Sequence, residues 1–169
     1  MNLMEVMSKD DVKELLIKGW MTHDAMWFYN CLQECGMEAT NKINRQAVRM
    51  MSMIEARRIT KAMGMDKVLT FNDLVKVFEE GADLIKARFM DFHLVYPEKN
   101  ILTWEMPSCF AYDGIKKIGA IDAYECGIIE RLLGWLDALG VSYELSPAGR
   151  KCMMHEKGSC RWEFRFKFE

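Results

Sequence analysis

Apolar residues in the first half of the chain recur with the 3.6-residue period of an α-helix. Ser8 is suited to start the first helix, and Gly36 is placed to end it. Gly64 is placed to end a second helix, and Thr70 opens a third. The pattern therefore predicts helices over about 9–35, 39–63 and 70–86, which together make a helical N-terminal part of about 9–86.

Beyond that part the period changes to two, which is typical of strands with one buried face. The segments "RFMDFHLVY" and "ILTWEM" predict a hairpin over about 87–107. A helix is expected over about 121–139, closed by Gly140. The ending, about 141–168, predicts strands in "VSYEL", "KCMMHE" and "SCRWEFRFKF", the last with Trp162, Phe164, Phe166 and Phe168 inward. We predict one α+β domain over 1–169, with helices packed on one face of an antiparallel sheet.

Composition narrows the class of protein. Half of the 169 residues are apolar and the formal charge is -2, so nucleic acid and anionic lipid are not expected as partners, although Arg57, Arg58 and Lys61 form a local basic patch. The N-terminus has no secretory signal, and no apolar run approaches the roughly 18 residues that span a bilayer. We therefore expect a cytoplasmic protein that is not inserted in a membrane. Fifteen methionines suggest an adaptable apolar interior.

The predicted first helix carries polar residues on its apolar side. One stripe, at helical spacing, contains Val12, Leu16, Gly19, His23, Met26, Trp27 and Asn30. We expect this stripe to face the core, with His23 either satisfied by an internal hydrogen bond or serving a functional site. Asp24 lies about a quarter turn away and is expected to face a partner helix or solvent.

Two other predicted helices repeat this arrangement. Arg57 and Lys61 share a stripe with Ile43, Met50 and Ile54, and Glu125 shares one with Ile121, Ile128, Leu132, Trp135 and Leu139. Because unpaired charges are costly to bury, we expect some of His23, Arg57 and Glu125 to meet one another or a polar ligand. The alternatives are a structural ion pair and a cleft in which His23, Asp24 or Glu125 is catalytic and Arg57 binds a carboxylate. The predicted ligand-binding residues are Trp20, His23, Trp27, Arg57 and Glu125.

The six cysteines show no disulfide framework. A turn at Lys157 and Gly158 would pair His155 with Cys160 on the apolar face. Cys152 would then point to the other face, which leaves too few local ligands for a closed zinc site. The candidate metal ligands are Cys109, Cys126, Cys152, His155 and Cys160. The sequence leaves zinc or iron as candidates but favours no metal, and it leaves the cofactor unknown. Cys31 and Cys35, one turn apart, are expected to be core residues.

Three stretches carry a family resemblance: "GWMTHDAMWF", "YECGIIERLLGWLDALGVSYE" and "CMMHEKGSCRWEFRF". With these, the chain resembles uncharacterised prokaryotic cytosolic proteins that are grouped with L-2-amino-thiazoline-4-carboxylate hydrolase-like proteins. The final segment more faintly resembles vinyl-reductase-type ligand-binding domains, related in fold to nitric-oxide sensors and a Golgi-transport subunit. The resemblance implies a helical layer over an antiparallel sheet, with a small-molecule pocket between them. It transfers no catalytic role to any residue.

Three functions follow as hypotheses. The first is a cytosolic domain that binds a small, partly apolar ligand in a pocket between helices and sheet. The second is a hydrolase for a small cyclic amide or amidine-like carboxylic acid, in which His23 or a metal-bound water attacks. The third is an interaction module that forms a homodimer through long apolar helical faces.

Overall fold

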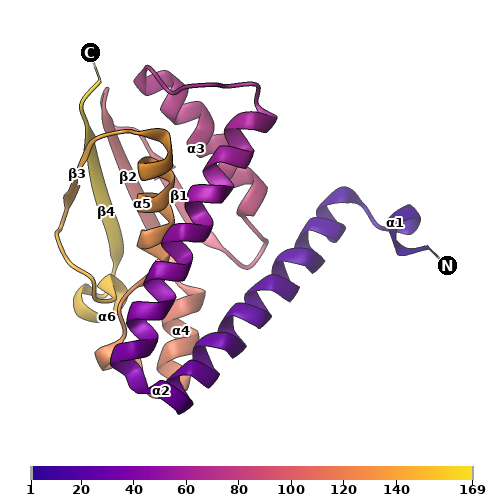
Figure 1. Ribbon diagram of the computed structural model, residues 1–169, viewed down its shortest axis with the longest axis vertical. Coiled ribbons are helices and arrows are strands. Elements are labelled where there is room, and N and C mark those ends of the chain that lie inside the picture. Colours follow the sequence, from indigo (N-terminus) through magenta and orange to yellow (C-terminus); the bar gives the residue numbers. More distant parts are fainter. Residues whose placement is uncertain (1, 169) are drawn as a thin grey trace.

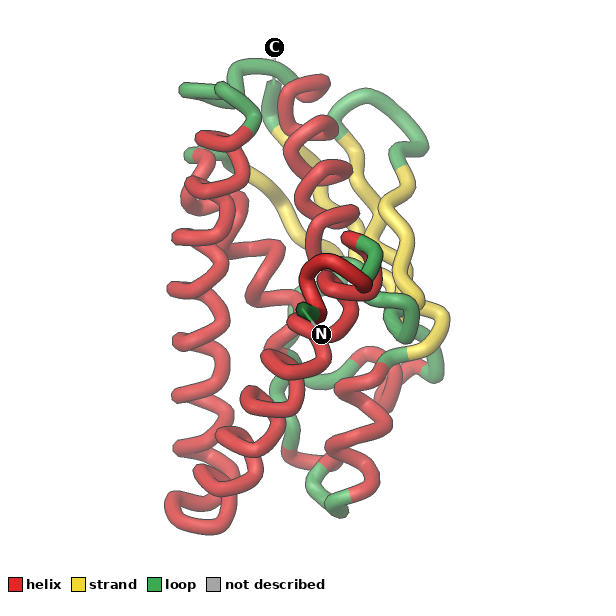
Figure 2. The backbone as a smooth tube through the Cα atoms, turned by 90° about the vertical axis from the view of Figure 1, so that its right-hand side faces the viewer, coloured by secondary structure: helices red, strands yellow, loops and turns green. Residues whose placement is uncertain are grey.

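The fold is a helical layer on one face of a sheet (Figures 1 and 2). The computed structural model describes residues 2–168 of the chain. Its elements are α1 (Leu3–Val6), α2 (Lys9–Ala62), α3 (Phe71–Ile85), β1 (Asp91–Val95), β2 (Ile101–Ser108), α4 (Phe110–Lys117), a 3-10 turn (Ile121–Ala123), α5 (Gly127–Leu139), β3 (Tyr143–Ser146), α6 (Met153–Lys157) and β4 (Cys160–Phe166). This arrangement confirms the predicted α+β class.

Gly36 divides α2 into two helical halves. Its backbone angles, φ 73° and ψ 172°, are not helical, and they lie in a region that is essentially restricted to glycine. The first half, residues 9–35, and the second half, residues 37–62, diverge from this point (Figure 1). The predicted helix end at Gly36 is therefore correct.

The four strands within residues 2–168 form one antiparallel sheet in the order β1-β2-β4-β3. β1 and β2 are the predicted hairpin, with His93 opposite Glu105 and Val95 opposite Thr103. β4 lies between β2 and β3, and it buries Trp162, Phe164 and Phe166 while its charged residues face outward. This alternation confirms the predicted inward face of the last strand.

α5 lies between the second half of α2 and the sheet. Two glycines permit this close packing: a Cβ on Gly134 would overlap the Ser52 side chain, and one on Gly81 of α3 would overlap the Trp135 ring. Ser52 and Trp135 are almost completely buried as a result. The core thus continues from α2 through α5 and α3 to the inner face of the sheet.

Two predicted elements are wrong in part. The helix expected over 121–139 begins only at Gly127, after a 3-10 turn, so Glu125 precedes α5 and instead forms an isolated bridge with Lys151. The expected strand "KCMMHE" is mostly the short helix α6, ended by Gly158 in a left-handed conformation. The predicted pairing of His155 with Cys160 does not form, because β4 pairs with β2 and β3.

The apolar stripes predicted for α2 face outward. Leu16 is 68% exposed and Trp27 is 61% exposed, and His23 and Asn30 are also exposed. In the second half the outward residues are Ile43, Met50, Ile54, Arg57 and Lys61. The core is instead met by the opposite faces, through residues such as Ile17, Phe28, Ser52, Ala56 and Ile59. Both faces of α2 are apolar, so periodicity alone could not distinguish them.

No helix within the described residues combines the length and apolarity that a membrane crossing needs.

Candidate functional site: an apolar cavity between α2, α5 and the sheet

A cavity of about 220 Å³ lies where the two halves of α2 face α5 and the sheet. The first half of α2 contributes Trp20, Met21 and Asp24, and the second half contributes Asn44, Ala47, Val48 and Met51. Ile128, Arg131 and Leu132 come from α5, and Phe92, Trp104 and Met106 come from the sheet. The lining is mostly aliphatic and aromatic, which is typical of a site for a small apolar ligand.

The aromatic wall of the cavity is held rigidly by the sheet. Phe92 on β1 stacks on Trp104 of β2, with ring centroids 4.5 Å apart and an interplanar angle of 19°. Lys86 lies over the Phe92 ring at 4.8 Å and donates a hydrogen bond to the Phe92 carbonyl at 2.7 Å. Such contacts hold the wall in one conformation, so the cavity has a defined shape.

A second cavity, of about 570 Å³, continues from the first beneath the first half of α2 toward α4. It adds Phe28, Phe89, Ile115 and Ile118 to the apolar lining. The residues that line both cavities are Met21, Asp24, Asn44, Phe110, Ala111 and Tyr124. The two cavities are therefore adjoining chambers, with the first half of α2 as their common roof.

Polar groups gather at one end of the first cavity. Arg131 donates two hydrogen bonds to Glu55, from Nε at 2.8 Å and from Nη2 at 2.5 Å, and Trp135 Nε1 donates to the same carboxylate at 2.8 Å. The Arg131 guanidinium also lies 4.7 Å from the centroid of the Trp20 ring. These contacts fix a planar cation at the edge of an apolar cavity.

Asp24 and Asn44 add two further polar groups to the lining, at the junction with the second cavity. Burial raises the pKa of the Asp24 carboxyl above its ordinary value, while the neighbouring charges of His23 and Arg131 act in the opposite direction. Asn44 lies against Gly127, where a Cβ would come within 2.8 Å of its amide nitrogen, so the glycine provides room for this side chain. The cavity thus offers a carboxyl, an amide and a guanidinium beside an apolar chamber.

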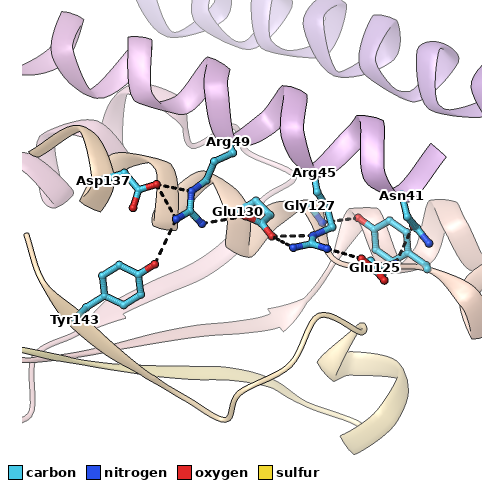
Figure 3. Close-up of polar contacts among 9 residues, drawn as sticks. Asn41, Arg45, Arg49, Glu125, Gly127, Glu130, Asp137 and Tyr143 are labelled. Carbon is cyan, nitrogen blue, oxygen red and sulfur yellow. Dashed lines mark hydrogen bonds and ion pairs between the residues drawn. The ribbon is translucent and has the colours of Figure 1, made fainter. Parts of the chain in front are cut away.

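A separate polar network joins α2 to α5 (Figure 3). Glu130 accepts hydrogen bonds from Arg45 at 2.8 Å and from Arg49 at 3.0 Å. Arg45 also donates to Glu125 at 2.6 Å, and Arg49 donates to Asp137 at 2.7 Å. Because each guanidinium bridges two carboxylates, the network is internally paired and is a structural connection between the helices.

The predicted site residues are therefore dispersed. Glu125 pairs with Arg45, and neither His23 nor Arg57 contacts it. His23, Trp27 and Arg57 lie on outward faces of α2, and none of the three lines the apolar cavity. Of the predicted ligand-binding residues only Trp20 lines it, and Asp24 does so among the catalytic candidates. Their roles stay predictions.

Sequence reasoning missed Asn44, Met51, Glu55 and Arg131. Asn44, Val48, Met51 and Glu55 are spaced by three or four residues and form a second stripe on α2. This stripe was the available signal, because it marks another face on which apolar and polar residues alternate with helical period.

Four candidate metal ligands interact electrostatically with one another: Cys109, Cys126 and Cys152, which are buried, and Cys160, which is half-buried. Burial raises the pKa of the Cys126 thiol to about 12 and that of Cys160 to about 11, and neighbouring thiols act in the same direction. His155 instead approaches Asp122 at 2.9 Å. Across residues 2–168, no group of three or more His, Cys, Asp or Glu residues is arranged to hold a metal ion.

Cys31 and Cys35 are not core residues as expected, since Cys31 is half-buried and Cys35 is exposed.

The fold and cavity define an α+β protein with a largely apolar cavity between its helical layer and its sheet. The chain belongs to the family of unknown function DUF6125, whose model matches residues 5–165. No curated protein is detectably similar in sequence.

Among solved structures, the fold is similar to that of a trafficking protein particle complex subunit 3 from Naegleria fowleri covalently bound to palmitic acid. The TM-score is 0.54 and the sequence identity is 15%, over 94% of this chain and 97% of that chain. This likeness shows the fold alone, and it partly matches the fainter resemblance, to Golgi-transport domains.

Proposed function

We propose that this protein binds a small molecule with an aliphatic chain and one polar end in the cavity between α2, α5 and the sheet. The observation that carries the proposal is the combination of an apolar chamber with the fixed guanidinium of Arg131 and the neighbouring Asp24 carboxyl in its lining. The aliphatic chain occupies the chamber against Phe92 and Met51. Its polar end meets the Arg131 Nη1, the nitrogen that makes neither hydrogen bond to Glu55.

The adjoining chamber supports a chain-like ligand over a compact one. The first cavity alone is smaller than the roughly 300–1,000 Å³ that is usual for ligand pockets. With the second cavity beside it, an extended ligand has a continuous apolar path beneath α2. The similarly folded protein that is covalently bound to palmitic acid supports the same chemical class.

Two adjacent methionines provide a matched test. Met51 lines the cavity, whereas Met50 points outward and is 67% exposed. We expect decanoate or palmitate to raise the melting temperature of the wild-type protein, by roughly 5–10 °C at a hundredfold excess over the dissociation constant. Met51→Trp fills the cavity and removes this rise, while Met50→Trp retains it. Isothermal titration calorimetry checks the stoichiometry.

The proposal fails if neither fatty acid binds, or if Met50→Trp and Met51→Trp bind them equally well. Binding that is lost in both variants to the same extent also contradicts it, because only one of the two methionines lines the cavity.

The hydrolase hypothesis gains no geometric support, because His23 and Arg57 lie on outward faces and neither reaches Arg131 or the cavity. A cytoplasmic location stays a prediction, which cell fractionation tests.

A further inference from the structure

The outward face of the first half of α2 is apolar although solvent covers it. We call this face the outer stripe and define it by the residues Leu15, Leu16, Gly19, His23, Trp27 and Asn30, all of which are exposed. It lies opposite the face that carries Ile17 and Phe28 into the core. A helix with apolar residues on both sides is typical of one that is covered on both sides.

The outer stripe contains no Asp, Glu, Lys or Arg. The acidic and basic residues between positions 15 and 30 other than His23 are Lys18 and Asp24, which lie at its flanks, and Lys18 is paired with Glu14 at 2.9 Å. His23 is the one titratable residue in the outer stripe, so two copies meet without like-charge repulsion when this imidazole is neutral. Such a surface is therefore suited to contact a second copy of itself.

The area is that of a small contact. Leu15, Leu16 and Trp27 are 55%, 68% and 61% exposed, and the other three residues of the outer stripe are exposed as well. At roughly 200 Å² for each fully exposed large side chain, the three apolar residues present roughly 370 Å² in one copy. Two copies bury roughly 700 Å² of this apolar surface, and the remaining residues of the stripe add to it, so the contact falls at the lower end of the size range of protein interfaces.

The spacing of the stripe provides the geometry. Leu16, Gly19, His23, Trp27 and Asn30 follow one another at intervals of three or four residues, which is the spacing of helices that pack side by side at a shallow angle. Gly19 leaves a recess on this face, since nothing lies within 4 Å of its Cβ position. If two copies lie antiparallel about a two-fold axis near His23, Gly19 of each copy faces Trp27 of the other.

We propose that the protein forms a homodimer through the outer stripe, with Trp27 of each copy seated over Gly19 of its partner. The contact is isologous, so the same residues serve on both sides. It lies on the opposite side of α2 from the ligand cavity. Neither Leu16 nor Trp27 lines either chamber, so the dimer does not depend on the proposed ligand.

Sedimentation equilibrium of the full chain tests the proposal. The wild-type protein is expected to be a dimer at micromolar concentration, and Trp27→Glu to raise the dimer dissociation constant about thirtyfold or more. Leu84→Glu, at a comparably exposed leucine of α3, is the control and leaves the dimer intact. Gly19→Leu fills the recess and also weakens the dimer, although leucine favours a helix more than glycine does. Circular dichroism confirms that each variant is folded.

A monomeric wild-type protein overturns the proposal, and so does a dimer that Trp27→Glu and Gly19→Leu leave unchanged. The alternative is that a lipid membrane, and not a second copy, covers the outer stripe. Co-sedimentation with vesicles of phosphatidylcholine and phosphatidylglycerol tests this alternative. A monomer that binds these vesicles through Trp27 assigns the outer stripe to a lipid surface instead. Fatty-acid binding by Trp27→Glu should equal that of the wild type, so loss of the dimer and loss of the ligand site are distinguishable.

Discussion

At the residue scale, Glu130 is the centre of the connection between α2 and α5. Its carboxylate is buried and accepts hydrogen bonds from both Arg45 and Arg49. A buried carboxylate is stable only where such partners compensate for lost hydration. Removing it leaves two guanidinium groups with fewer acceptors in a partly buried place.

We expect Glu130→Ala to lower the free energy of unfolding by about 3 kcal/mol, because it breaks a buried, charged hydrogen-bond network. Asp137→Ala removes a partner of Arg49 that is exposed, and it is expected to cost about 1 kcal/mol or less. Urea unfolding of both variants measures the difference. Equal losses would show that burial of Glu130 has no energetic consequence.

The buried thiols predict a loss of stability at alkaline pH. An unburied cysteine ionises near pH 9, whereas burial raises the pKa of Cys160 to about 11 and that of Cys126 to about 12 in the folded chain. Between about pH 9 and 10 the unfolded chain therefore binds fewer protons than the folded chain, and the free energy of unfolding falls as pH rises. Each thiol contributes up to about 1.4 kcal/mol per pH unit.

Denaturant unfolding at a series of pH values over this window measures the slope. Cys126→Ala should reduce the dependence of the free energy of unfolding on pH by the contribution of one thiol. A variant with the wild-type slope would show that the Cys126 thiol does not cause the alkaline loss of stability. The window ends near pH 10 because burial also raises the pKa of Tyr96 and Tyr124, which adds a slope of the same sign at higher pH.

At the element scale, the contact between α2 and α5 depends on the absence of a side chain at Gly134. A Cβ there would overlap Ser52 Oγ and would lie 2.6 Å from the Arg49 carbonyl oxygen. Backbone atoms of a helix move only if the whole element shifts, so relief of this overlap requires α5 to move away from α2.

Gly134→Ala is expected to lower the free energy of unfolding by about 3 kcal/mol and the melting temperature by roughly 10 °C. Gly149→Ala is the matched control, since its Cβ position is open and its φ is negative or extended, and it should change stability by no more than about 0.5 kcal/mol. Differential scanning calorimetry compares the two. A Gly134→Ala protein as stable as the control would mean that the helices are packed less closely than described.

At the scale of the whole molecule, the fold class was predictable because each pattern has a local cause. Gly36 ends a helical half through its own backbone conformation, and the alternation from Trp162 to Phe166 requires a strand with one buried face. The prediction of a strand at Cys152–Glu156 was wrong, because an alternation over five residues is too short to distinguish a strand from a helical turn.

The candidate site was less predictable, because it depends on which face of α2 turns inward. The predicted stripe through His23 and Trp27 and the actual inner stripe through Met21 and Phe28 are both apolar. Only tertiary packing against α5 and the sheet distinguishes them. Trp20 and Asp24 reach the cavity because they lie at the border between the two stripes.

The backbone at Gly36 sets the width of the cavity. The roof of both chambers is the first half of α2, and a wall of the first chamber is the second half, so the angle between the halves determines the distance that a ligand must fill. If the protein binds aliphatic chains as proposed, we expect a longer chain to change that angle by rotation at Gly36, without breaking either helix. Since the outer stripe is on the other side of the same half-helix, its orientation would then change with the length of the bound chain.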